Sequence, residues 1–153
     1  MLHLQISVRR LVVLMTLGIC APVQAVNPSQ EAVRSTIEAF SKALEAGQTS
    51  LLHELSADSF RMVEDGVDYD LESSVLSIKE ALKSGTVVRT TGDFTVFTEG
   101  SVAWAVYHVG VSFRSARNSF SFHRIETAVL VDRGAGWKVA MITSMPIETS
   151  ASH

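Results

Sequence analysis

The stretch 119–147, SFSFHRIETAVLVDRGAGWKVAMITSMPI, decides how the rest of the chain folds. Apolar and polar residues alternate along both of its halves, as they do in half-buried β-strands. The Gly-rich segment 133–136 separates the halves, and Trp137 opens the second one. A short Gly-rich segment between two alternating runs is typical of a β-hairpin. We therefore expect two long strands, at about 119–132 and 137–147, joined by a tight turn.

The same period-two alternation begins upstream of this hairpin. It predicts two further strands, at about 87–98 and 101–114, and short connections join each strand to the next. Consecutive strands with hairpin-length connections form an antiparallel meander. The C-terminal half of the chain therefore predicts one sheet of four long strands.

The N-terminal part of the chain is mainly helical in pattern. Apolar residues recur at helical spacing in two runs, and Gly47 and Gly85 follow these runs as stop signals. In order, we expect a helix at 28–46, a short helix carrying Leu51, Leu52 and Leu55, strands at 60–64 and 67–70, and a helix at 71–83. Helices followed by an antiparallel sheet indicate an α+β fold, with the helices packed on one face of a curved sheet.

The first 25 residues have the pattern of a secretory signal peptide. Arg9 and Arg10 form a short positive region, the apolar run 11–20 follows, and cleavage is expected after the small Ala25. A membrane anchor is the alternative. It is disfavoured because about ten residues at ~1.5 Å each cannot cross a hydrocarbon core of ~30 Å. We therefore expect a periplasmic or secreted protein with no membrane attachment after cleavage.

The residues after this leader are enough for one domain. The segment 26–148 can bury a single core, and no internal repeat or linker divides it. The last residues, 149–153, are expected to form a frayed tail.

Composition excludes several classes of site. Cys20 is the single cysteine and lies in the leader; a lipoprotein signal there is disfavoured because the large Ile19 precedes it. No cysteine remains after cleavage, which excludes disulfides and thiol nucleophiles. Without Arg9 and Arg10, 11 Lys and Arg oppose 16 Asp and Glu, a net charge of −5 with no basic cluster, which argues against nucleic acid. The histidines lack ligand spacing and no phosphate-binding loop is present, so we expect neither a metal nor a cofactor.

Three segments carry a resemblance to a known superfamily: FSKALEAG at 40–47, ADSFRMVEDG at 57–66 and ETAVLVDRGAGWKV at 126–139. With the order of elements, they resemble the nuclear transport factor 2-like superfamily, in particular an exported bacterial member of its SnoaL-like and ketosteroid-isomerase-like branch. The resemblance covers about 30–147. It implies a cone-shaped α+β barrel, in which the sheet wraps the first helix and leaves a pocket at the open end. Members include isomerases, hydratases, epoxide hydrolases, polyketide cyclases and binding modules.

The resemblance also implies a homodimer, because most single-domain members pair through the convex face of the sheet. In the strand 101–114, both faces are largely apolar, so one of them is available for a partner subunit. The face that carries Tyr107, Val109 and Val111 is the candidate contact.

Catalytic positions follow from the same resemblance. The tripeptide that ends at Asp65 (VED) matches the one that ends in the catalytic Asp of the isomerase branch, so a buried Asp65 would act as a base. The alternative is a turn residue, because Asp65 precedes Gly66.

Two further residues are candidates for acid–base chemistry. Glu126 matches the second acid of the branch in type and shares a strand face with Arg124, either as a polar pair in the pocket or as an exposed ladder pair. His108 lies within an apolar strand, as an acid–base group or as a structural residue.

Two positions depart from the branch. Phe40 stands where the branch has a Tyr that donates to the oxyanion, and Thr143 stands where many relatives have a His. The residues expected to line a ligand pocket are Phe40, Phe60, Met62, Tyr69, Trp104, Phe122, Arg124, Met141 and Thr143. We therefore favour a module that binds a small apolar molecule, or an association module, without catalysis. The alternative is an isomerase, dehydratase or cyclase that uses a pocket carboxylate as general base.

Overall fold

The computed structural model describes residues 28–147, and the expected leader at 1–25 and tail at 149–153 lie outside the described residues. The elements are α1 (Pro28–Ala46), α2 (Thr49–Leu55), β1 (Ser56–Glu64), β2 (Val67–Tyr69), α3 (Leu71–Ser84), β3 (Gly85–Glu99), β4 (Val102–Ser115), β5 (Ser119–Asp132) and β6 (Trp137–Pro146). Their order confirms the predicted α+β fold. Within the described residues, no helix combines the length and apolarity needed to cross a membrane.

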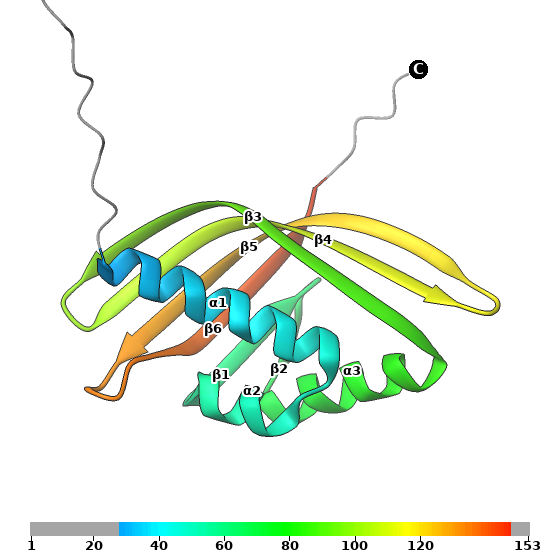
Figure 1. The fold of residues 1–153 in the computed structure, drawn as a ribbon, viewed down its shortest axis with the longest axis horizontal. Coiled ribbons are helices and arrows are strands. Elements are labelled where there is room, and N and C mark those ends of the chain that lie inside the picture. The colour runs from blue at the N-terminus through cyan, green and yellow to red at the C-terminus, as the bar shows by residue number, and fades with distance from the viewer. Residues whose placement is uncertain (1–27, 148–153) are drawn as a thin grey trace, which may run out of the picture.

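The strands form one mixed sheet in the order β2-β1-β6-β5-β4-β3. The predicted antiparallel meander of β3 to β6 is confirmed, and β1 joins it by pairing parallel to β6. This pairing starts β1 at Ser56, opposite Val139, whereas the sequence pattern placed the strand start at Phe60. The sheet is strongly bent but stays open between β2 and β3, so the cone is not a closed barrel (Figure 1).

The hairpin of β5 and β6 has the turn that its Gly-rich connection predicts. Gly134 and Gly136 have φ values of 90° and 91°, a backbone region that residues with a Cβ rarely adopt. The Asp132 carboxylate accepts hydrogen bonds from the backbone N–H groups of both glycines, at 2.7 and 3.2 Å. These contacts stabilise the turn that connects β5 to β6.

The helices cover one face of the bent sheet, with α1 lying across the concave side (Figure 1). The buried residues of β4 are Ala103, Ala105, Tyr107, Val109 and Val111. The face with Tyr107 and Val109 is therefore the inner one, and the opposite face, with Trp104 and Val106, is the outer one. This corrects the sequence-based choice of the dimer face, because alternation alone defines two faces without saying which one the helices cover.

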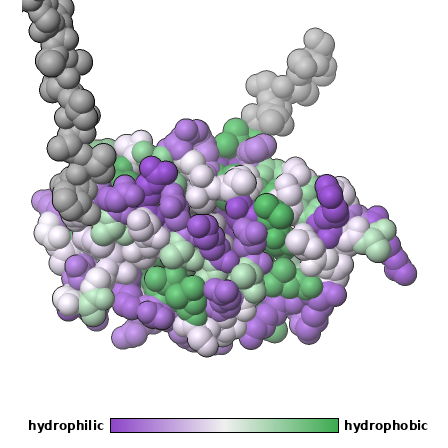
Figure 2. Space-filling view, viewed as in Figure 1, coloured by the Kyte–Doolittle hydropathy of each residue, from purple (hydrophilic) through white to green (hydrophobic). Residues whose placement is uncertain are grey.

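The solvent side of the helical layer is mainly polar. On the side of the molecule seen in Figure 2, hydrophilic side chains surround separate, small hydrophobic patches. Beneath this layer, Phe40 of α1 packs against Phe60 of β1, with ring centroids 5.4 Å apart. Both rings belong to the apolar core between helices and sheet.

Candidate functional site

A cavity of about 150 Å³ lies between α3 and the inner face of the sheet. It is lined by Leu44 of α1, Met62 and Glu64 of β1, Tyr69 of β2, Ser74, Ser77, Ile78 and Ala81 of α3, and Arg89 of β3. Leu44, Met62 and Ile78 supply apolar walls, and the remaining side chains are mainly polar. The cavity is therefore amphipathic rather than purely apolar.

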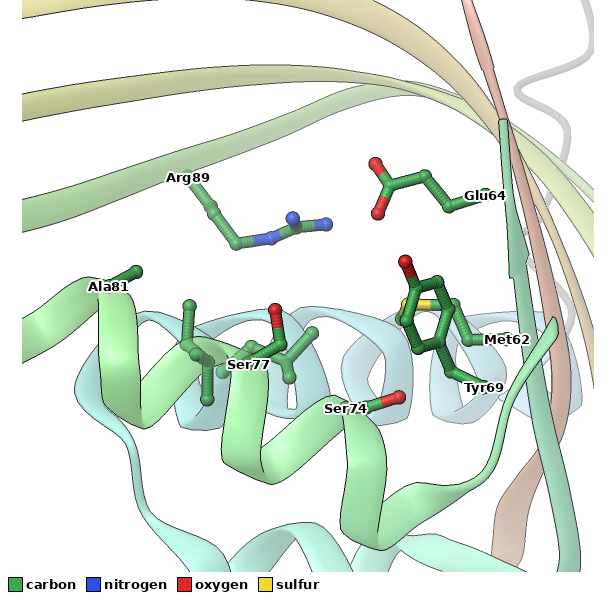
Figure 3. A pocket seen from close by; sticks show the side chains of 9 residues that line it. Met62, Glu64, Tyr69, Ser74, Ser77, Ala81 and Arg89 are labelled. Carbon is green, nitrogen blue, oxygen red and sulfur yellow. The ribbon is translucent and has the colours of Figure 1, made fainter. Parts of the chain in front are cut away.

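The polar groups of the cavity converge from different elements. Figure 3 shows the Arg89 guanidinium and the Glu64 carboxylate pointing towards each other, with the Tyr69 hydroxyl next to them. Among the described residues, the Tyr69 hydroxyl, the Ser77 hydroxyl and the Nη1 of Arg89 have no hydrogen-bond partner. These groups are available to a ligand.

Arg89 is held by its other donors. Its Nη2 donates to Oε1 of Glu126 at 2.9 Å, and its Nε donates to the Ser41 hydroxyl at 3.2 Å. Its backbone N–H donates to Oε2 of Glu45, also at 3.2 Å. The guanidinium side chain is only 14% exposed, so an arginine at this depth requires a paired carboxylate. Two side-chain contacts therefore fix the position of the cation in the cavity, and the third holds the backbone of β3 at this residue.

Glu126 is the buried partner of Arg89 and is only 3% exposed. Its Oε2 accepts from the Tyr107 hydroxyl at 2.9 Å, and its Oε1 also accepts from the Ser144 hydroxyl at 3.4 Å. Burial, together with the neighbouring charge of Glu126, raises the pKa of Tyr107 well above its usual value, so its hydroxyl stays a donor. Both oxygens of Glu126 are thus occupied by donors within the protein.

Arg124 is a second buried arginine, on the same face of β5. It donates from Nε to the Ser144 hydroxyl at 2.7 Å and from Nη2 to Asp65 at 2.7 Å, and its Nε lies 3.4 Å from Glu64. Burial opposes its charge, but the hydrogen bond that Arg124 donates to Asp65 and the charges of Glu64, Asp65 and Glu126 outweigh burial and raise the pKa of Arg124. Arg124 and Glu126 share a face of β5, but the connection between them runs through the Ser144 hydroxyl, which accepts from Arg124 and donates to Glu126.

Asp65 lies in the two-residue turn between β1 and β2. Asp65 and Gly66 have φ values of 51° and 81°, as expected for an Asp-Gly hairpin turn. The Asp65 side chain is 60% exposed, and its hydrogen bond with Arg124 lowers the pKa of its carboxyl. An exposed carboxylate with a lowered pKa is a weaker base than a free one. The geometry therefore favours the turn role over the proton-abstracting role.

Comparison with known proteins identifies the fold. No family model and no curated protein sequence matches this chain. An NTF2-like protein from Cytophaga hutchinsonii matches with a TM-score of 0.69 and 10% identity, over 79% of this chain and 100% of its own. An NTF2-like protein with a cystatin-like fold from Novosphingobium aromaticivorans matches with a TM-score of 0.69 and 19% identity, over 80% and 84%. The fold is NTF2-like.

A protein from Shewanella frigidimarina that is provisionally named a ketosteroid isomerase has the same NTF2-like fold. It matches with a TM-score of 0.64 and 18% identity, over 74% of this chain and 94% of its own. At this identity the likeness establishes the fold alone, because one fold hosts many functions.

On this NTF2-like scaffold, several expected pocket residues lie elsewhere. Trp104 and Met141 both pair with Val129 of β5 and lie on the outer face of the sheet. Thr143 lies on the same face, opposite Thr127. His108 is on the outer face as well, half-exposed and 3.1 Å from Asp93 of β3. The reason is the strand alternation, which turns each of these positions away from the helices.

The inner-face residues divide into three groups. Met62 and Tyr69 line the cavity. Phe40 and Phe60 belong to the closed core, and Phe122 is 37% exposed, with Arg124 above its ring at 5.8 Å. Arg124 touches the cavity indirectly, through its ion pair with Glu64.

Sequence reasoning missed Arg89, Ser74 and Ser77, and it treated Glu64 only as a neighbour of Asp65. The inward direction of Arg89 could have been inferred, because it lies two residues after the buried Val87 on the same strand and therefore on the same face. Ser74 and Ser77 are three residues apart on α3, so they share a face of the helix, and each directly precedes a residue of its apolar stripe, Val75 and Ile78. Within residues 28–147, no group of three His, Cys, Asp or Glu side chains is arranged to hold a metal.

The ion pair of Asp65 with Arg124 predicts a pH-dependent contribution to stability. Because the folded pKa of Asp65 is lowered, this contribution is present above the unfolded value of about 3.9 and is lost as the pH falls through the lower folded value. Asp65→Asn, which tolerates positive φ, should lower the thermal midpoint by a few degrees at pH 7, and the difference should shrink on acidification. Thermal unfolding of both proteins across this range measures it. Asp58→Asn, at an exposed position of β1, is the control and should show no such pattern.

The buried pair of Arg89 and Glu126 predicts a strong asymmetry between single and double variants. Glu126→Leu leaves the Arg89 cation and the Tyr107 hydroxyl without their acceptor, and we expect a loss of roughly 3–5 kcal/mol in the free energy of unfolding. The double variant Arg89→Met with Glu126→Leu should recover much of that loss, because no unpaired charge is left. Urea unfolding measures both. A double variant less stable than Glu126→Leu would contradict the pairing argument.

Proposed function

We propose that this chain is a small-molecule-binding module rather than a catalyst. One observation carries the proposal: the cavity offers donors without partners, from Arg89, Tyr69 and Ser77, whereas the expected bases are committed to other groups. Asp65 is exposed and held by Arg124, and Glu126 accepts hydrogen bonds on both oxygens. A ligand can bind to such a cavity, but neither carboxylate is free to take a proton from it.

The volume of the cavity limits the size of the ligand. A cavity of about 150 Å³ matches the volume that holds benzene in an engineered protein core. Its apolar walls, from Leu44, Met62 and Ile78, suit a compact ring or short chain with a polar end. The part of the proposed ligand that the cavity encloses is therefore much smaller than a steroid and is not wholly apolar.

The alternative function is an isomerase, dehydratase or cyclase. It is favoured by one feature of the cavity, the Glu64 carboxylate, which faces the space beside the Tyr69 hydroxyl and has only the 3.4 Å contact with Arg124. In that case Glu64 would be the base and Tyr69 the donor to the developing oxyanion. Turnover of a small carbonyl compound that is abolished by Glu64→Gln would favour this function over simple binding.

We also propose that the module acts outside the cytoplasm. Support comes from the leader pattern of Arg9, Arg10 and the apolar run 11–20, and from the placement of Cys20, the single cysteine, inside that leader.

Filling the cavity predicts loss of ligand binding. Ala81 lines the cavity from α3, so Ala81→Phe should occupy most of its space and weaken the binding of phenol and benzyl alcohol at least tenfold. Leu76→Phe is the matched control, because Leu76 lies on the same helix and is 61% exposed. Ligand-observed NMR titrations of the three proteins measure the effect. Equal binding by wild type and Ala81→Phe would place the ligand elsewhere and refute the proposal.

A homodimer through the outer face of the sheet is the second part of the proposal. The exposed apolar residues on β3, β4 and β6 of this face are Val88, Phe97, Val102, Trp104, Val106, Met141 and Met145. Phe97 and Trp104 stack with ring centroids 5.2 Å apart, and the neighbouring outward residues Thr127 and Thr143 are uncharged. The centre of this face is therefore uncharged, and two copies can bring it together there without opposing like charges, although the chain as a whole is acidic.

A charge at the centre of this face should prevent dimer formation. We expect sedimentation velocity to show a dimer for wild type and a monomer for Trp104→Glu, because the variant would bury two facing carboxylates. Val67→Glu adds the same charge at an exposed position of β2 and should remain dimeric. Circular dichroism checks that both variants are folded. A monomeric wild type at micromolar concentration would refute the dimer.

A further inference from the structure

We infer that the cavity selects uncharged ligands that carry a carbonyl-type acceptor beside a hydrogen-bond donor, such as a primary amide, and discriminates against carboxylates. The inference rests on the proposed binding function and concerns the charge of the ligand. It follows from the way in which the cations and anions around the cavity are already paired.

The first half of the recognition is an acceptor on the ligand. Arg89 lines the cavity with an Nη1 that has no partner in the described chain, while its Nε and Nη2 are occupied by Ser41 and Glu126. Figure 3 shows the Tyr69 hydroxyl in the same space as the Arg89 guanidinium, and it is also without a partner among the described residues. Both groups can donate to one carbonyl oxygen.

A single arginine in a cavity commonly suggests an anionic ligand, but here its charge is already balanced. Glu126, 2.9 Å away, neutralises Arg89 before any ligand arrives. Glu45 adds a carboxylate that accepts from the backbone N–H of Arg89 at 3.2 Å. No positive charge is therefore left over at this end of the cavity.

The other end of the cavity carries an excess of negative charge. Arg124 pairs there with two carboxylates, Glu64 at 3.4 Å and Asp65 at 2.7 Å. The groups named around the site are thus two arginines and four carboxylates, a formal net charge of −2. A bound carboxylate would add a third negative charge in a partly desolvated space, which is unfavourable.

The second half of the recognition is a donor on the ligand. Glu64 points into the cavity towards Arg89, and its contact with Arg124 is long, so it can accept from an N–H or O–H group. A primary amide presents its oxygen and its N–H side by side, so that it can contact Arg89 and Glu64 together. An isosteric carboxylate loses the contact with Glu64 and replaces it with repulsion.

Benzamide and benzoate test this directly, because they have nearly the same shape and differ in charge at pH 7. Isothermal titration calorimetry at 0.15 M salt should give a benzamide Kd at least tenfold lower than the benzoate Kd for the wild-type protein. Glu64→Gln removes the negative charge and should reduce this ratio at least tenfold. Glu99→Gln, an exposed change at the end of β3, is the matched control and should leave the ratio unchanged. Thermal unfolding checks that both variants are folded.

The outcomes separate the inference from the proposed function. Benzoate binding as tightly as benzamide to wild type would overturn the inference, and so would an unchanged ratio in Glu64→Gln. Binding of phenol without binding of benzamide would also overturn it, while leaving the cavity as a ligand site. Loss of benzamide binding in Ala81→Phe would confirm that the amide occupies the cavity. Absence of binding by all four small molecules would overturn the binding function itself and the inference with it.

Discussion

The buried carboxylate of Glu126 is the constraint on which the interior of this protein depends. A charge that is 3% exposed must be paired and hydrogen-bonded, and Glu126 meets this requirement with three side chains from three other strands. Arg89 comes from β3, Tyr107 from β4 and Ser144 from β6. The pairing orients Arg89 in the cavity, because the guanidinium cannot turn away without leaving Glu126 unpaired.

The same constraint limits the chemistry that the site can perform. Arg124 donates to Asp65 and Arg89 donates to Glu126, so that both carboxylates expected as bases are held by arginines. For Asp65, this pairing lowers the pKa of the carboxyl and weakens it as a base. A protein that shares its fold with a provisionally named isomerase can therefore present a binding cavity without an available base at the expected positions. Glu64 is the one carboxylate among the described residues that line the cavity, its contact with Arg124 is long, and its role therefore distinguishes the two proposed functions.

The outer face of the sheet and the cavity lie on opposite sides of the sheet. The helices bury the inner face, where alternate residues of β4 and β5 form the core and hold the charged pairs. None of the helices within residues 28–147 covers the outer face, which presents Trp104, Phe97 and Met141 to solvent. Because the two faces alternate along every strand, a residue cannot serve both the cavity and a dimer contact. For this reason His108, Trp104 and Thr143, which the sequence suggested as site residues, lie on the outer face and outside the cavity.

The sequence by itself determined the elements and their order, because helical spacing, strand alternation and turn residues are local signals. The hairpin 119–147, the Asp65-Gly66 turn and the two long helices were predicted near their observed bounds for this reason. Only the tertiary structure decided which sheet face is covered and which charges meet. Arg89 and Glu126 are 37 residues apart, and no periodicity links them. Alternation places Glu126 on one of two faces, and the packing of α1 and α3 against that face makes it buried, paired and unavailable as a base.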